Sequence, residues 1–192
     1  MDPINLIAGL NIIAAFAANA GGAKKGLRSS VIGTKEKPKS YLQAVPLTLS
    51  VLTLVALIIA VFQLGTFGYK ISYQSLRVFG LAVYIIFSWI QIWAYKAMGS
   101  NYAQEILIFK DHNLVEKGPF RVIRHPQYIS QILLDLGAGI ATLSYILIPL
   151  ALIQIPLLIL RAGLEEKLLA KNFKDKFDLY KKKTGFMIPF VG

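Results

Sequence analysis

The chain has 192 residues, of which 55% are hydrophobic and only 16% charged, and its mean hydropathy is +0.56. This is too apolar for a soluble domain of that length, so we predict an all-α integral membrane protein with a single domain. The net charge is +11. Because the basic residues adjoin apolar segments, membrane lipids explain them better than nucleic acid, which we do not expect as a partner.

The sequence has no cysteine and only two histidines. It therefore forms no disulfide and offers neither a thiolate ligand nor a thiol nucleophile. A zinc site built by this chain would need carboxylates to complete it. We expect no bound metal.

Long apolar segments divide the chain. The first, residues 4–20, follows Pro3, as expected of a helix with proline in its first turn. The triplet Ala18-Asn19-Ala20 resembles a signal-peptidase site, but the positive charges follow the segment instead of preceding it. We therefore predict an uncleaved membrane anchor. The other apolar segments are residues 45–64, 76–98 and 129–160.

The segment 129–160 is too long for one crossing, for which about 20 residues suffice. We predict two helices joined by a tight turn at Ser144-Tyr145, the second of them bent by Pro149 and Pro156. The chain would then have about five transmembrane helices.

The distribution of charge agrees with that count. The connectors 21–40 and 99–128 and the region from Arg161 onward would lie on one side, and they carry 6, 4 and 8 Lys or Arg residues. The other side would hold Lys70, with Arg77 at the edge of a span. The positive-inside rule then places the N-terminus outside and the C-terminus inside the cell.

The connector 99–128 contains both histidines and is unusually long for a connection without a function. Its runs 105–110 and 114–116 are β-prone and predict a short hairpin or two extended segments, and Gly118-Pro119 predicts a turn.

Pro126 is well suited to begin the fourth helix, because His125 before it is biased towards extended geometry. Free backbone N–H groups near Gln127 and Tyr128 would then form a seat for an anion such as a ligand carboxylate. The alternative is an ordinary helix start whose basic neighbours bind phospholipid.

Residues 165–183 have apolar side chains on one side and lysines on the other, which predicts an amphipathic helix on the membrane surface. Glu165 and Glu166 would open this helix, where carboxylates favour the positive end of the helix dipole. Arg161 precedes them at the end of a span, and such an arginine often only anchors the helix at the interface.

Asp135 lies within an apolar span, so its carboxylate must face protein or water. Together with Gln131 one turn earlier, it would either line the path of a substrate or hold helices together. We expect Tyr84, Tyr95 and the two tryptophans of the third span to serve packing and interfacial anchoring.

The run H-x-L-V-x-x-G-P-F-x-x-x-R-H-P-x-Y at residues 112–128, followed by R-x-x-x-E-E at residues 161–166, resembles the isoprenylcysteine carboxyl methyltransferase family and the related phospholipid N-methyltransferases. The resemblance covers residues 99–190, the predicted catalytic half, whereas residues 1–98 match only as hydrophobic segments. Phe120 stands where the family usually has tyrosine. The short chain is similar to the small prokaryotic members, which implies a prokaryotic cytoplasmic membrane.

The resemblance implies an integral membrane enzyme that uses S-adenosylmethionine and releases S-adenosylhomocysteine. It implies that Arg161 meets the methyl acceptor and that Glu166 is a catalytic residue in contact with the cofactor. Glu105 falls at a cofactor position but differs in residue type. The remaining implied cofactor residues are His112, Asn113, Leu114, Val115, Phe120, His125, Pro126, Gln127, Tyr128 and Glu165.

The chemistry of these side chains suits such a cofactor, which needs acceptors for its amine, donors for its carboxylate and an apolar slot for its adenine. Methyl transfer requires mainly alignment and exclusion of water. A carboxylate acceptor is already a nucleophile and needs a cation to place it, which the guanidinium of Arg161 could provide.

We therefore predict a membrane methyltransferase acting on a lipophilic acceptor, most readily an isoprenylcysteine-type or other lipid-like acid. A phospholipid or other lipid amine is the alternative, and it would need a general base such as Glu165 or Asp135. A third possibility is a membrane protein without catalytic activity whose basic face binds anionic lipid or a partner.

Overall fold

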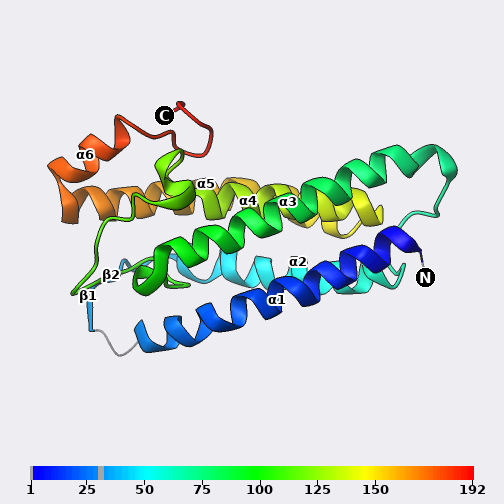
Figure 1. Cartoon of the computed structure of the whole chain (residues 1–192), viewed down its shortest axis with the longest axis horizontal. Coiled ribbons are helices and arrows are strands. Elements are labelled where there is room, and N and C mark those ends of the chain that lie inside the picture. The colour runs from blue at the N-terminus through cyan, green and yellow to red at the C-terminus, as the bar shows by residue number, and fades with distance from the viewer. Residues whose placement is uncertain (1, 30–32) are drawn as a thin grey trace.

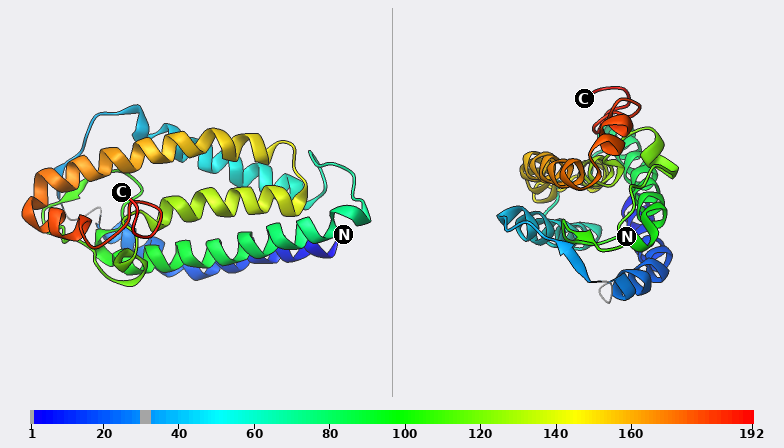
Figure 2. Two further views of the ribbon diagram at one scale, coloured as in Figure 1. Left: turned by 90° about the horizontal axis from the view of Figure 1, so that it is seen from above. Right: turned by 90° about the vertical axis from the view of Figure 1, so that its left-hand side faces the viewer.

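The computed structural model describes residues 2–29 and 33–192, and the side chains among them except for residues 20–29. Five long helices run along one common axis, and a short sixth helix lies beside one end of the bundle (Figures 1 and 2). The helices are α1 Pro3–Ser29, α2 Val45–Val61, α3 Gln74–Met98, α4 Pro126–Thr142, α5 Leu147–Phe173 and α6 Asp175–Lys181.

Three helical stretches in the described part of the chain are long and apolar enough to cross a membrane, namely Tyr41–Val61, Ile71–Asn101 and Leu147–Phe173. A shorter apolar helix covers Pro3–Asn19. The predicted integral membrane protein is thus confirmed at the level of fold class, whereas the count of five spans stays a prediction.

Glycines allow α3 and α4 to pack closely. A Cβ atom on Gly80 would lie 2.7 Å from the backbone nitrogen of Ala141, and one on Gly137 would lie 2.7 Å from that of Tyr84. Small residues at such a contact let two helix backbones approach, as is common in membrane bundles. The core beside this contact consists of Ala8, Ala56, Leu57, Val61, Leu81, Tyr84, Ala138, Ala141 and Leu147.

Arg77 closes the end of the bundle that holds the N-terminus, which we call the Arg77 end. The residue is 2% exposed. Its guanidinium pairs with Asp2 at 2.6 Å and also donates to the side chain of Asn5 and to the carbonyl of Ala141. Asp2 in turn accepts from the backbone N–H groups of Ile4 and Asn5, so it caps α1. This network fastens α1, α3 and α4 together.

The predicted hairpin between the fourth and fifth helices is confirmed. Leu143 ends α4 in the left-handed region with φ of 53°, and the backbone N–H of Leu147 donates to the hydroxyl of Ser144 as α5 begins. Helix α4 begins at Pro126, as predicted. Pro156 lies inside α5.

Two expectations about the connectors are wrong. The predicted connector after the first span is helical as far as Ser29, and its residues 30–32 lie outside the described part. Of the two alternatives for residues 105–110 and 114–116, the hairpin is wrong, because the strand β2, Ile108–Phe109, pairs antiparallel with β1, Thr34–Glu36. A strand more than 70 residues away in the sequence supplies the partner, which local patterning does not reveal.

Helix α5 also differs from the prediction. It continues from the membrane span without a break to Phe173, so Glu165 and Glu166 lie in its interior and do not open a new helix. The break comes at Lys174, which adopts a positive φ of 46° before α6.

Candidate active site

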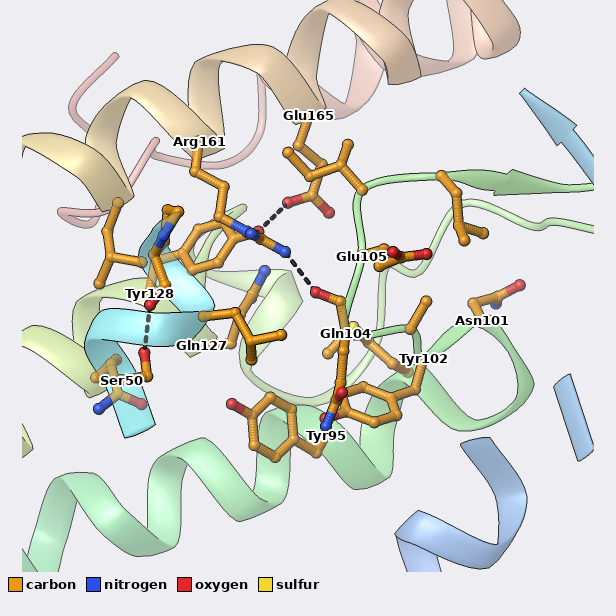
Figure 3. Close-up of a pocket in the computed structure, with 18 of the residues that line it drawn as sticks. Ser50, Tyr95, Asn101, Tyr102, Gln104, Glu105, Gln127, Tyr128, Arg161 and Glu165 are labelled. Carbon is orange, nitrogen blue, oxygen red and sulfur yellow. Dashed lines mark hydrogen bonds between the residues drawn. The ribbon is translucent and has the colours of Figure 1, made fainter. Parts of the chain in front are cut away.

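A cavity of about 200 Å³ lies at the other end of the bundle, which we call the Arg161 end (Figure 3). Its walls come from α2, α3, α4 and α5 and from the segment 101–112. We call it the first cavity. Seven of the predicted site residues line it, namely Glu105, His112, Gln127, Tyr128, Gln131, Arg161 and Glu165.

Arg161 is the most heavily engaged of these residues. Its guanidinium donates to the backbone carbonyls of Leu42, at 2.7 Å, Gln43, at 3.2 Å, and Gln104, and to the hydroxyl of Tyr128, at 3.1 Å. These contacts use four of the five N–H donors that a guanidinium carries. The side chain is 6% exposed. Arg161 therefore binds the walls of the cavity together, and within the described part of the chain one of its donors is left for a further partner.

Tyr128 links Arg161 to a carboxylate. While its hydroxyl oxygen accepts from Arg161, its hydroxyl proton is donated to Glu165 at 2.9 Å. Arg161 and Glu165 are one helical turn apart on α5 and point across the cavity towards Tyr95 of α3 (Figure 3). The hydroxyl of Tyr128 thus orients both charged side chains, and it links them in place of a direct ion pair.

His112 forms a wall of the cavity with aromatic neighbours. Its ring stacks on Phe109 at a centroid distance of 6.1 Å and lies 5.9 Å from the ring of Phe173. Burial lowers the pKa of His112 below its ordinary value of 6.5, so the imidazole is neutral near pH 7. Among the described residues, its buried Nδ1 atom has no hydrogen-bond partner.

Gln127 supplies a second buried polar atom to the same cavity, because its Oε1 atom also has no hydrogen-bond partner within the described chain. Unpaired buried polar atoms are rare in proteins and carry a desolvation penalty, so each one calls for an explanation. Two of them on one cavity are what a site for a polar ligand would leave in the absence of that ligand.

Several lining residues were not predicted as site residues. Tyr95 and Tyr102 face each other with ring centroids 5.0 Å apart, and Gln104 and Asn101 lie beside them (Figure 3). The sequence does contain a signal for Tyr95. Polar residues recur along α3 at Tyr84, Ser88, Gln91 and Tyr95, a spacing of three or four that marks one face of an otherwise apolar helix.

Glu166 does not line the first cavity. Successive residues on a helix point about 100° apart, and the carboxylates of Glu165 and Glu166 approach different nitrogens of the His125 ring, Nδ1 at 3.8 Å and Nε2 at 3.4 Å. Glu166 also pairs with Arg124 at 2.5 Å and lies 3.4 Å from the Nζ atom of Lys181.

The same cluster binds the C-terminal segment. The guanidinium of Arg124 donates to the backbone carbonyls of Thr184 and Gly192, and the backbone N–H of His125 donates to the carbonyl of Phe186. This cluster therefore fastens the segment 184–192 against the start of α4.

The remaining predicted residues lie behind the cavity or beside it. Val115 and Phe120 pack with Ala94 and Ala97 of α3 in a small apolar core. Asn113 is exposed, Leu114 is half-buried, and Pro126 is buried at the first turn of α4. None of these residues is among those that line the first cavity in the described structure.

The predicted anion seat at the start of α4 is only partly available. The backbone N–H of Tyr128 donates to the carbonyl of His125 at 3.2 Å. That group is therefore already satisfied within the chain, and the prediction of a free donor at this position is wrong.

A second cavity of about 230 Å³ lies deeper in the bundle, among α1, α2, α3 and α4. Asp135 lines this second cavity and not the first one. Gln131 lines both, and it donates to Asp135 at 2.7 Å. Gln131 therefore lies between the two cavities, and Asp135 belongs to the second.

Comparisons with known proteins support the fold. A solved structure of the eukaryotic intramembrane Ras methyltransferase ICMT (isoprenylcysteine carboxyl methyltransferase) is similar to the whole chain, with a TM-score of 0.62 over 100% of this chain and 69% of the other. The two sequences are 22% identical, so this likeness shows a shared fold. A search among curated proteins found no match.

A family model named phospholipid methyltransferase matches residues 76–176, which is more than half of the chain. The match includes nearly all of α3, the whole of α4 and α5, and the connector that holds His112. Methyltransferases of this kind generally use S-adenosylmethionine. The chain therefore belongs to the phospholipid methyltransferase family and is a membrane methyltransferase.

Proposed function

We propose that the chain transfers a methyl group from S-adenosylmethionine, bound in the first cavity, to a lipophilic acceptor that arrives through the membrane. The observation that carries this proposal is the composition of that cavity. It combines carboxylates, a neutral imidazole, two buried polar atoms without partners in the described chain, and two tyrosine rings.

The lining residues fit the parts of the cofactor. Glu165 and Glu105 provide acceptors for its amine, and the guanidinium of Arg161 retains a donor for its carboxylate or for the acceptor. Tyr95 and Tyr102 offer apolar faces to its adenine. When bound, S-adenosylmethionine supplies a methyl group on a positively charged sulfur.

The protein would contribute alignment and exclusion of water, which account for much of the acceleration in reactions between two bound molecules. His112 would remain neutral beside the cationic cofactor, because burial lowers its pKa. Glu166 would act indirectly, since it orients Arg124 and His125 at the start of α4.

Two acceptor classes fit this site. A carboxylate would use the remaining N–H donor of Arg161. It would form one hydrogen bond and not a bidentate pair, because three backbone carbonyls occupy the other donors needed for that pair. A lipid amine is favoured by a different observation, the buried carboxylate of Asp135 next to Gln131.

We also propose how the chain sits in the membrane. The five long helices would all cross it, with the N-terminus outside and the Arg161 end in the cytoplasm. The excess of Lys and Arg in residues 21–40, 99–128 and 161–192 supports this orientation. By the resemblance of the sequence, the membrane would be the cytoplasmic membrane of a prokaryote.

Two measurements test the proposal. Calorimetry should detect binding of S-adenosylhomocysteine to the full chain in an uncharged detergent. Incubation of the protein with labelled S-adenosylmethionine and a total lipid extract should then give labelled lipid. If S-adenosylhomocysteine does not bind, the proposal fails and a membrane protein with a lipid-binding basic face becomes the better reading.

The labelled lipid also reports the acceptor class. A methyl ester loses its label in base, whereas an N-methyl group keeps it. Release of the label would favour the carboxylate acceptor, and retention would favour the amine.

A further inference from the structure

The side chain of Gln43 is bound to the backbone of one wall of the first cavity. Its amide nitrogen donates to the carbonyl of Ile106 at 2.8 Å, and its amide oxygen accepts from the backbone N–H of the same residue at 2.8 Å. The amide nitrogen also donates to the carbonyl of Pro38 at 3.2 Å. Gln43 thus pairs with both backbone groups of Ile106, as a residue of a neighbouring strand would.

The backbone groups of Ile106 need these bonds because the residue is buried. It is 3% exposed and packs with Ile108 and with Leu168 of α5 in a small core. A buried N–H or C=O group that loses its partner carries a desolvation penalty. Without the amide of Gln43, this part of the chain would have to shift until water reached both groups.

Such a shift would change the first cavity directly. Ile106 lies within the segment 101–112, of which residues 101–107 and His112 line that cavity. Glu105 immediately precedes Ile106 and is one of the carboxylates of the cavity. Displacement of Ile106 would therefore also displace an acceptor proposed for the amine of the cofactor.

Other contacts join the same connector, residues 33–43, to the Arg161 end. The strand β1 pairs with β2, Glu36 accepts from Lys171 at 2.6 Å, and Lys37 pairs with Glu105 at 2.7 Å. These two ion pairs have exposed lysines, and exposed pairs contribute little. Gln43 is half-buried and makes its two bonds to a single buried residue, so we expect it to be the more important side chain.

Gln43 lies outside the region that matches the family. The match begins at residue 76, whereas Ile106 and Arg161 both lie within it. The backbone carbonyl of Gln43 accepts from Arg161 at 3.2 Å while its side chain holds Ile106. One residue of the N-terminal half therefore joins two separate walls of the cavity in the family region.

We propose that Gln43 is a positioning residue of the cofactor site, whose side-chain amide fixes the segment 101–107 so that Glu105 faces the bound cofactor. This inference rests on the proposed function and adds to it a residue from outside the family region. Gln43 is not among the residues that line the first cavity in the described structure, so it acts through Ile106. Loss of the amide lowers the fraction of molecules that are competent to bind, and the apparent affinity falls with that fraction.

Replacing Gln43 by methionine tests the inference, because methionine keeps the length of the side chain and removes the amide. Calorimetry of S-adenosylhomocysteine with the full chain in an uncharged detergent should show about tenfold weaker binding, the order expected when hydrogen bonds to a buried residue are lost. Gln74→Met, at an exposed glutamine of the Arg77 end, should keep the affinity of wild type. An affinity within about twofold of wild type in Gln43→Met would overturn the inference.

A second variant covers the case in which the first one does not fold. Gln43→Asn keeps the amide but shortens the side chain by one carbon, so the amide no longer reaches both groups of Ile106. We expect it to weaken binding in the same direction. If Gln43→Met does not fold, Gln43→Asn decides by the same threshold.

Steady-state kinetics distinguishes positioning from a general loss of structure. With labelled S-adenosylmethionine and a total lipid extract, KM for S-adenosylmethionine should rise about tenfold in Gln43→Met while kcat stays within about twofold of wild type. The reason is that the bound cofactor itself holds the segment, so the lost interaction is one that the ground state and the transition state share. A merely structural role would lower kcat through the amount of folded enzyme and leave KM unchanged, which would overturn the inference.

Hydrogen exchange locates the change without relying on activity. In Gln43→Met the amides of residues 101–112 should exchange faster than in wild type, while those of α3 and α4 keep their rates. Added S-adenosylhomocysteine should restore the protection of that segment. Faster exchange throughout the bundle, or none in the segment, would contradict a positioning role.

The wild-type protein separates the two levels of the proposal. If wild type binds S-adenosylhomocysteine and the Gln43 variants bind it equally well, only the positioning role fails. If wild type does not bind it, the proposed function itself fails.

Discussion

The two ends of the bundle each bury an arginine but use it differently. At the Arg77 end the guanidinium meets a carboxylate directly, Asp2 at 2.6 Å, together with Asn5 and a carbonyl of α4. At the Arg161 end the guanidinium meets backbone carbonyls and reaches the carboxylate of Glu165 only through the hydroxyl of Tyr128.

The difference separates a closed structural network from a candidate ligand site. The Arg77 network pairs its charges within the protein, and such a closed network stabilises the bundle without inviting a ligand. The Arg161 network leaves a cavity with a carboxylate and unpaired buried atoms of His112 and Gln127 in the described chain. Polar groups left in that state are suited to bind another molecule.

Replacing Arg77 by alanine should have the largest effect on stability. The change leaves the carboxylate of Asp2 without its partner, and loss of one member of a buried pair typically costs about 3–5 kcal/mol. The free energy of unfolding in detergent measures this loss. The protein that stays folded should bind S-adenosylhomocysteine normally, and Lys70→Ala at an exposed position nearby should change neither property.

Replacing Arg161 by lysine should have its largest effect on activity. One ammonium group cannot reach carbonyls on two separate segments and the hydroxyl of Tyr128 at once, so the walls of the first cavity would shift. We expect the rate of methyl transfer to fall about 100-fold, which corresponds to about 2.7 kcal/mol in the barrier. A rate within twofold of wild type would show that charge alone suffices.

The protonation state of His112 should have a smaller effect on cofactor affinity, and this effect depends on pH. Its pKa is lowered in the folded protein, so the neutral form is favoured and its contribution to stability is fully present above pH 6.5. As the pH falls below that value, protonation disfavours both the buried ring and a cationic ligand. Calorimetry of S-adenosylmethionine should show constant affinity above pH 6.5 and a loss of up to about tenfold below it.

His112→Gln provides the control for this pH dependence. The variant should remove the loss of affinity on acidification, because its amide does not titrate. If the variant and the wild type lose affinity in parallel, another group is responsible.

The ion pair between Lys37 and Glu105 should have the smallest effect. The two side chains are 45% and 46% exposed, and exposed pairs contribute about 0–1 kcal/mol. Lys37→Gln should therefore change the free energy of unfolding by less than about 1 kcal/mol. A larger loss would mean that exposed residues at the Arg161 end contribute strongly to stability. The contrast between a stabilising Arg77 end and a ligand-binding Arg161 end would then be weaker.

The sequence predicted the helices well because membrane spans follow from composition. The long apolar runs, the turn at Ser144-Tyr145 and the start of α4 at Pro126 all have local causes. The end of the fifth helix was predicted wrongly because the prediction used local sequence alone. Arg161, Glu165 and Glu166 look like a boundary in sequence, but tertiary contacts to residues 42, 104 and 124 keep the helix intact there.

The sequence predicted part of the lining of the first cavity. The motif identified Tyr128, His112 and Glu165, but it did not distinguish the direction in which Glu165 and Glu166 point, because neighbours in sequence diverge only once the helix is placed against others. Tyr95 was read as packing, although its polar spacing with Gln91 is visible in the sequence. The carbonyl groups that bind Arg161 leave no mark in the sequence, since every residue carries one.

The central claim is that the first cavity, bordered by Glu165, holds the cofactor while Glu166 only supports the start of α4. Calorimetry of S-adenosylhomocysteine with Glu165→Gln and Glu166→Gln tests it most directly. We predict that Glu165→Gln weakens binding by about tenfold or more and that Glu166→Gln lowers stability while the folded protein keeps nearly full affinity. Loss of binding in Glu166→Gln with normal binding in Glu165→Gln would contradict the account.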